Sequence, residues 1–232
     1  MRRVRIYLLA LFAASTVPAM AAADSGAALL ESRCASCHAL SKPSDASLDR
    51  LLSRKGPDLY YAGTKFNKEW LVRWLQEPTV IRAAGVMYRK AVKPGAPGSA
   101  DVVDESLITP HMKLSADDAA LAADALLALG SDLGLVEKGA YKQTPSNAMA
   151  AMLFNKLRGC SSCHAAKPGD ASHSGVELFT AGERLQADYV VEYIRDPQKF
   201  DPHIWMPRLG LNDADVQKLT GYLMTLKQEG AK

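Results

Sequence analysis

Two short motifs contain all four cysteines of the 232-residue chain: RCASCH at residues 33–38 and GCSSCH at residues 159–164. In each motif, two cysteines are separated by two residues and followed directly by a histidine; the residues are Cys34, Cys37 and His38, and Cys160, Cys163 and His164. This C-x-x-C-H pattern is typical of c-type haem attachment, in which two thiols form thioethers to the porphyrin and the imidazole binds the iron. The sequence therefore predicts two covalently bound haem c groups.

Three other uses of these cysteines are alternatives. A disulfide within each C-x-x-C pair would close a very small loop and add little stability, because the entropy gained from loop closure grows with loop length. A thioredoxin-like redox pair needs a βαβ context, which the sequence does not indicate. A zinc site that shares ligands between the two pairs is the third alternative. The histidine directly after each pair favours haem over all three.

The first 23 residues have the anatomy of a secretory signal. Three arginines precede an apolar run, and the alanine-rich end at residues 19–23 offers an A-x-A cleavage site. An uncleaved anchor is the alternative, because the 18 residues from Ile6 to Ala23 carry no charge and approach the length of a membrane span. Pro18 and the alanines favour cleavage. We expect an exported protein in the periplasm, without stable membrane insertion.

The signal also accounts for the net charge. The chain has a formal charge of +3, from 28 basic and 25 acidic residues, and three of the basic residues are the arginines of the signal. The remaining chain has equal numbers of acidic and basic residues. We therefore expect no nucleic-acid partner.

An internal repeat extends well beyond the cysteine motifs. Residues 56–78, GPDLYYAGTKFNKEWLVRWLQEP, align without a gap on residues 175–197, GVELFTAGERLQADYVVEYIRDP, at an offset of 119. The identical residues include the first glycine, the Ala-Gly pair and the last proline, and Trp70 aligns with Tyr189. The segment that begins at Leu114 is similar to the segment that begins at Leu211. The chain therefore contains two copies of one domain.

The fold class predicted for both copies is all-α. Ser115 and Asn212 are N-cap residues for a closing helix, and a middle helix ends before the proline of each copy. A first helix leads into each cysteine motif, and no alternating run suggests a sheet. We predict a first domain at 24–130, a linker without periodicity at 131–147 and a second domain at 148–232.

Each predicted iron has a second axial position, which a methionine thioether would fill in an electron-transferring centre. Met112 and Met206 are the candidates, because each lies in the loop before the closing helix of its copy. Gap-filling in the core is the alternative role for both. His111, next to Met112, and Met87 are alternative ligands of the first iron.

On these residues the chain resembles dihaem class I c-type cytochromes, broadly like cytochrome c4, in which two small all-helical haem domains are joined in tandem. The resemblance rests on both C-x-x-C-H motifs, both methionine loops and the segment GPDL. It implies that the backbone carbonyl of Pro57 accepts a hydrogen bond from His38 and orients that ring. The second copy departs from this pattern, because Val176 replaces the proline.

An insertion at about residues 79–104 makes the first copy longer. Pro78 and Met112 are 34 residues apart, whereas their counterparts in the second copy are 9 apart. The plainer interpretation is a tolerated surface insertion. The alternative is a docking loop for an acidic redox partner, steered by basic residues: Arg82, Arg89, Lys90 and Lys93.

These features predict a periplasmic dihaem cytochrome that transfers single electrons and is not an enzyme. Its partners would be proteins: a periplasmic dehydrogenase, a terminal oxidase or another cytochrome. It would act as a free carrier or as the electron-accepting subunit of a dehydrogenase. The alternative is a dihaem enzyme, a peroxidase or a thiosulfate-oxidising cytochrome, which needs an open position or a cysteinate ligand at one iron.

Overall fold

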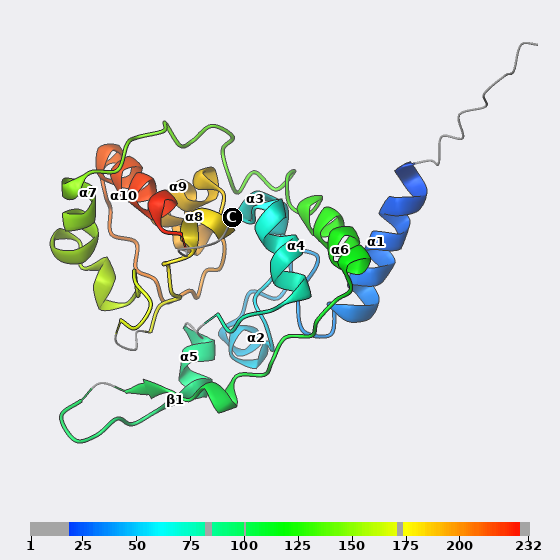
Figure 1. Ribbon diagram of the computed structural model, residues 1–232, viewed down its shortest axis with the longest axis horizontal. Coiled ribbons are helices and arrows are strands. Elements are labelled where there is room, and N and C mark those ends of the chain that lie inside the picture. The colour runs from blue at the N-terminus through cyan, green and yellow to red at the C-terminus, as the bar shows by residue number, and fades with distance from the viewer. Residues whose placement is uncertain (1–18, 82–84, 100, 171–173, 228–232) are drawn as a thin grey trace, which may run out of the picture.

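The structure, a computed structural model, describes residues 19–81, 85–99, 101–170 and 174–227. Figure 1 shows two helical lobes, formed by the N-terminal and C-terminal parts of the chain, and an arm that extends from the first lobe. Residues 1–18 of the predicted signal lie outside the described residues. Within the described part of the chain, no helix is long and apolar enough to cross a membrane.

Both lobes begin with a helix that leads into the cysteine motif and then share a short helix, a middle helix and a closing helix. The first lobe contains α1 (Ala19–Arg33), α2 (Leu48–Ser53), α3 (Ala62–Lys65), α4 (Lys68–Gln76) and α6 (Ala116–Leu127). The second contains α7 (Ala148–Met152), a π-helical turn (Leu153–Leu157), a 3-10 turn (Cys160–Ser162), α8 (Ala181–Arg184), α9 (Ala187–Arg195), a 3-10 turn (Pro197–Lys199) and α10 (Asp213–Thr225). The expectation of a mostly helical chain is confirmed.

The helices within the two copies of the predicted repeat begin and end at matching residues. α3 and α8 have equivalent bounds at an offset of 119, and so do α4 and α9. Both middle helices end before a proline, as predicted: α4 before Pro78 and α9 before Pro197. A proline cannot donate the backbone hydrogen bond that would continue the helix, so the same residue ends it in both copies.

The closing helices begin at the predicted caps. The Ser115 side chain accepts a hydrogen bond from the backbone N–H of Asp118, and the Asn212 side chain accepts one from that of Asp215. Each cap satisfies an N–H group that has no partner within its helix. Acidic residues in both first turns further stabilise the positive end of the helix dipole.

A glycine in the short helix before the middle helix, α3 or α8, lets this helix approach the closing helix in each lobe. The backbone N–H of Gly63 donates to the carbonyl of Leu129 (3.0 Å), and Gly182 donates to Leu226 (2.9 Å). A Cβ atom at Gly63 would overlap the carbonyl oxygen of Leu127, and one at Gly182 would overlap that of Met224. Only a residue without a side chain permits this approach.

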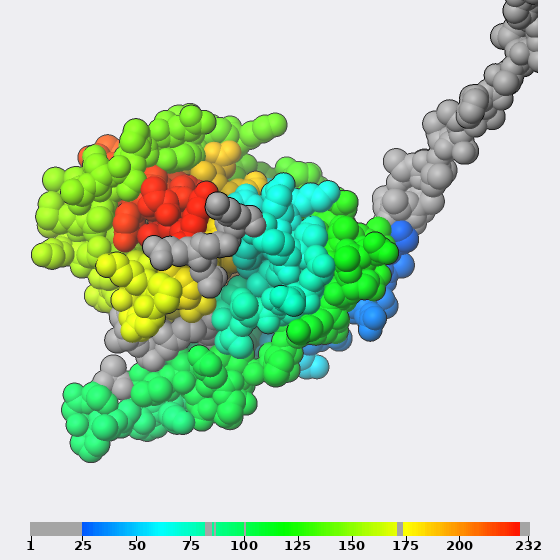
Figure 2. All heavy atoms as spheres, viewed as in Figure 1, coloured from blue at the N-terminus to red at the C-terminus, as the bar shows by residue number. Residues whose placement is uncertain are grey.

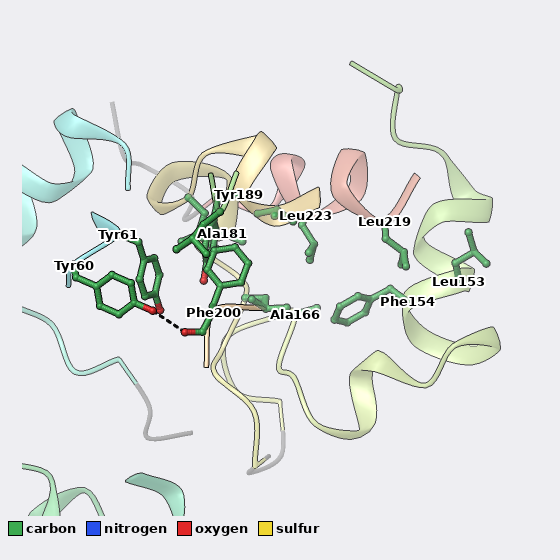
Figure 3. Close-up of a cluster of buried hydrophobic side chains, with 14 residues drawn as sticks. Tyr60, Tyr61, Leu153, Phe154, Ala166, Ala181, Tyr189, Phe200, Leu219 and Leu223 are labelled. Carbon is green, nitrogen blue, oxygen red and sulfur yellow. Dashed lines mark hydrogen bonds between the residues drawn. The ribbon is translucent and has the colours of Figure 1, made fainter. Parts of the chain in front are cut away.

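The hydrophobic cores of the two lobes meet. In the first lobe, buried residues of α1, α4 and α6 pack around Leu30, Leu71 and Leu126. The core of the second lobe also contains Tyr60 and Tyr61 of the first. Figure 3 shows both tyrosines facing residues of the second lobe, with the Tyr60 hydroxyl donating to the carbonyl of Phe200 (2.8 Å).

The insertion forms the protruding arm seen in Figure 2. It contains α5 (Val86–Ala91) and a two-stranded antiparallel sheet of β1 (Val92–Lys93) and β2 (Val102–Val103), and a 3-10 turn (Glu105–Leu107) follows it. This hairpin was not expected from the sequence, because strands of two residues are too short to show an alternating pattern. Its own small core consists of Ala91 and Val103 with partly buried neighbours.

Candidate metal centres at the two cysteine motifs

The two C-x-x-C-H motifs fold into the same turn. In the first, the backbone N–H groups of Cys37 (3.1 Å) and His38 (3.0 Å) both donate to the carbonyl of Cys34. In the second, the equivalent donors reach the carbonyl of Cys160 at the same two distances, 3.1 and 3.0 Å. A tight turn of this kind brings both sulfurs and the imidazole to one side of the chain.

Each histidine is held by a backbone carbonyl. His38 Nδ1 lies 2.7 Å from the carbonyl oxygen of Pro57, and His164 Nδ1 lies 2.6 Å from that of Val176. The replacement of proline by valine therefore leaves the acceptor in place. Because a carbonyl only accepts, Nδ1 carries the proton and Nε2 is left with the lone pair that binds metal.

A glycine makes room for each ring. A Cβ atom at Gly56 would lie 2.6 Å from the ring of His38, and one at Gly175 would lie 2.7 Å from the ring of His164. A backbone hydrogen bond fixes the same loop from the other side: Leu59 donates to Ala39 (2.9 Å) in the first copy. These cradles fit an imidazole that must be fixed in orientation, as an axial ligand is.

None of the four cysteines forms a disulfide, and the two of each motif differ in exposure. Cys34 and Cys160, the first of each pair, are half-buried, and burial raises the pKa of both thiols. Cys37 and Cys163 are exposed. Two thiols with an imidazole beside them are the donor set that covalent haem requires, and both motifs supply it.

A shallow hollow of about 330 Å³ lies beside the first motif. It is lined by residues of the motif and by three basic side chains, those of Arg50, Arg54 and Lys55. Arg50 forms a bidentate ion pair with Asp58 (2.6 and 3.1 Å).

Burial lowers the pKa of His38, which keeps the ring neutral and able to bind metal.

The loop before α6 presents two candidate ligands, and both are exposed. The ring centroids of His111 and His38 are 6.2 Å apart. Trp74 packs on His111, with 4.6 Å between the ring centroids, and His111 Nδ1 lies 2.9 Å from the carbonyl oxygen of Met112. The Met112 side chain is 44% exposed. The structure thus brings His111, the alternative candidate, towards His38.

The loop before α10 differs. Met206 is half-buried, and its carbonyl accepts a hydrogen bond from Gln198 Nε2 (2.8 Å). The residue before it is Trp205, which is 49% exposed. The indole nitrogen has no lone pair for a metal, so Met206 is the ligand candidate of this loop.

The other sequence candidates lie in the arm. Met87 packs against the small core of the arm, between α5 and the hairpin. Of the basic residues proposed for docking, Lys93 forms an ion pair with Asp104 (3.1 Å) and Lys90 donates to the carbonyl of Arg54 (3.1 Å). Arg89 is exposed, and Arg82 lies outside the described residues.

Equivalent residues of the two lobes bind one another across a local two-fold arrangement. Phe66 and Leu185, which align in the repeat, form an antiparallel bridge. The residues that follow them, Asn67 and Gln186, each donate through the side-chain amide to two carbonyls of the opposite lobe. These bonds run from Asn67 to Glu183 (2.8 Å) and Leu185 (3.1 Å), and from Gln186 to Gly63 (2.9 Å) and Phe66 (2.8 Å).

Two basic residues at equivalent positions of the repeat, Lys65 and Arg184, lie at this contact. Lys65 Nζ stands 5.0 Å from the ring centroid of Phe66 and 5.6 Å from that of Tyr189. Burial, with the charge of Arg184 as a further cause, lowers the pKa of Lys65 to about 7. Arg184 donates to the carbonyl of Glu177 (2.9 Å), and its buried Nε has no hydrogen-bond partner among the described residues.

Comparison with protein-family models, curated proteins and solved structures finds no match for this chain. Among the described residues, no group of three or more His, Cys, Asp or Glu side chains is placed to hold a metal ion. The sequence pointed to both cysteine turns and both loops, but not to the interface residues. Asn67 and Gln186 occupy the same position in the aligned repeat, and this match of two side-chain amides is the sequence signal that could have identified them.

Proposed function

We propose that the protein is a periplasmic dihaem c-type cytochrome that carries single electrons between protein partners. Covalently bound haem would supply a one-electron couple between ferrous and ferric iron. The residues proposed to hold the two groups are Cys34, Cys37 and His38 for the first, with Pro57 behind the ring, and Cys160, Cys163, His164 and Met206 for the second. For the second axial position of the first iron, the loop before α6 offers Met112 and His111.

The observation that carries this proposal is the paired support of the two histidines. Each motif has the same turn, and the Nδ1 atom of each ring lies within 2.7 Å of a carbonyl oxygen, that of Pro57 or Val176. This hydrogen bond fixes the tautomer and raises the basicity of the ligating nitrogen. A zinc site shared between the pairs would not require two separate, equivalent turns.

The contact between the lobes supports transfer from one centre to the other. Four side-chain hydrogen bonds and an antiparallel bridge join equivalent segments. Fixed lobes keep the distance between their redox centres constant, so that an electron accepted by one lobe can leave through the other. A donor loses one electron and an acceptor gains it in each cycle.

Electron transfer is favoured over catalysis because all four cysteines belong to the two motifs, which leaves none to ligate an iron, and because each loop before a closing helix offers a methionine in place of an open position. Partners of the proposed carrier are a periplasmic dehydrogenase, a terminal oxidase or another cytochrome. A stable complex that survives purification would make the protein a subunit of a dehydrogenase, and its absence would make it a free carrier.

The test is a count of covalent haem on protein exported with the c-type maturation machinery. We expect a denatured mass increased by two haem groups and a pyridine haemochrome spectrum of c type. The double variant Cys34→Ser/Cys37→Ser should retain one haem, and the matched variant Cys160→Ser/Cys163→Ser should retain the other. A wild-type chain without covalent haem would contradict the proposal.

A further inference from the structure

The rings of His38 and His111 stand opposite each other in the first lobe. Their centroids are 6.2 Å apart, with 46° between the ring planes. A metal bound between two imidazole nitrogens that both point at it, at about 2.0 Å from each and with each nitrogen about 1.1 Å from its ring centre, separates the centroids by about 6.2 Å. The observed separation therefore fits two imidazoles that share one metal between them.

Both rings also have the same hydrogen-bonding arrangement. Nδ1 of His38 faces the carbonyl of Pro57 (2.7 Å), and Nδ1 of His111 faces the carbonyl of Met112 (2.9 Å). Each Nδ1 is therefore the protonated nitrogen, and each Nε2 keeps its lone pair. A ligating histidine almost always has its second nitrogen bound in this way.

A third ring holds His111 in place. Trp74 packs on it with 4.6 Å between centroids, and the Trp74 indole nitrogen donates to the carbonyl of Thr79 (3.1 Å). Trp70 stacks on Trp74 in turn, at 5.6 Å and 22°. His111 and Met112 are both exposed, but only His111 belongs to this row of packed rings along α4.

We infer that His111, and not Met112, is the second axial ligand of the first iron, which makes the first haem bis-histidine and the second histidine–methionine. In the second copy, Trp205 stands at the position before Met206, where the first copy has His111. Methionine ligation raises the potential of a haem. The first haem is therefore the lower-potential centre, and electrons move from the first lobe to the second.

This inference rests on the proposed function, and its test begins with the haem count. The oxidised protein should show the weak red band that arises from methionine sulfur and ferric iron, with the intensity of one such ligand per two haems. Met206→Leu should remove the band, and Met112→Leu, the matched control in the other loop, should leave the spectrum unchanged.

His111→Gly tests the ligand directly. We expect half of the haem in this variant to leave the bis-histidine state, seen as a high-spin spectrum or as a second methionine band, and added imidazole to restore the low-spin spectrum. Loss of half the red band in Met112→Leu, or an unchanged spectrum in His111→Gly, would overturn the inference while two covalent haems still support the proposed function. Absence of covalent haem would overturn both.

Discussion

The two lobes build the same motif turn and then differ in the loop that faces it. Each C-x-x-C-H turn is closed by the same two backbone hydrogen bonds, and each histidine is held by one carbonyl. In the loop before the closing helix, the first lobe turns His111 towards His38, whereas the second places Met206 in a half-buried position behind an exposed Trp205. The short motif is therefore built alike in both lobes, whereas the loop before the closing helix is not.

The arm is the second difference. Only the first copy has it, and it carries a hairpin with its own core. It also touches the second lobe, since the backbone N–H of Gly85 donates to the carbonyl of Ser174 (3.1 Å). The largest difference between the copies therefore also contributes a contact between the two lobes.

The largest effect is expected when the glycine at the contact with the closing helix is replaced by alanine in each lobe, which tests whether the two lobes pack alike. Gly63→Ala and Gly182→Ala should each destabilise the protein by about 3 kcal/mol, because the added methyl overlaps a helix carbonyl that cannot move freely. Chemical denaturation measures both. Gly210→Ala, where nothing lies within 4 Å of the new atom, is the control and should cost only about 1 kcal/mol, for its positive φ. If Gly63→Ala or Gly182→Ala destabilised the protein no more than Gly210→Ala, the close contact with the closing helix would not exist in that lobe.

The next test uses a difference in charge chemistry at the lobe contact, where Lys65 is equivalent to Arg184. The pKa of Lys65 is about 7 in the folded chain and 10.5 in the unfolded chain. Between these values the unfolded chain binds more protons, so stability should rise with pH, by up to about 1.4 kcal/mol per pH unit. Below pH 7 this contribution to the pH dependence disappears. The measurement is the free energy of unfolding from pH 7 to 9.

In that experiment Lys65→Met should remove the slope, because no amine is left to titrate. Lys68→Met is the control, since Lys68 is exposed and forms an ion pair with Asp124; it should keep the slope of the wild type. Equal slopes in the wild type and Lys65→Met would mean that the amine keeps its charge through an anionic partner, and the prediction would be wrong.

The smallest effect is expected for the amides that join the lobes. Asn67→Ala and Gln186→Ala each remove two hydrogen bonds and leave carbonyls unpaired, which should cost about 1–2 kcal/mol apiece. In the double variant we expect the lobes to melt separately in calorimetry. A single unchanged transition in the double variant would contradict the importance of this contact.

Much of the local structure was predictable, because local signals determine it. The caps Ser115 and Asn212 and the stop before Pro78 follow from backbone donors and acceptors only a few residues apart. The hairpin of the arm was not predicted, because strands of two residues are too short to show an alternation of apolar and polar residues. The roles of Asn67 and Gln186 were also missed: both stand at N-cap positions, yet their side chains make no cap and bind the other lobe instead.

The sequence by itself determined the two cysteine motifs, the duplication and the positions of most helices, because each depends on residue types at short, fixed spacings. Tertiary structure alone decided which side chain of the HM pair at residues 111–112 turns towards His38, since that depends on Trp74 of a distant helix. It also decided that equivalent segments of the two copies pair with each other. Such contacts join residues more than one hundred positions apart, and no spacing along the chain specifies them.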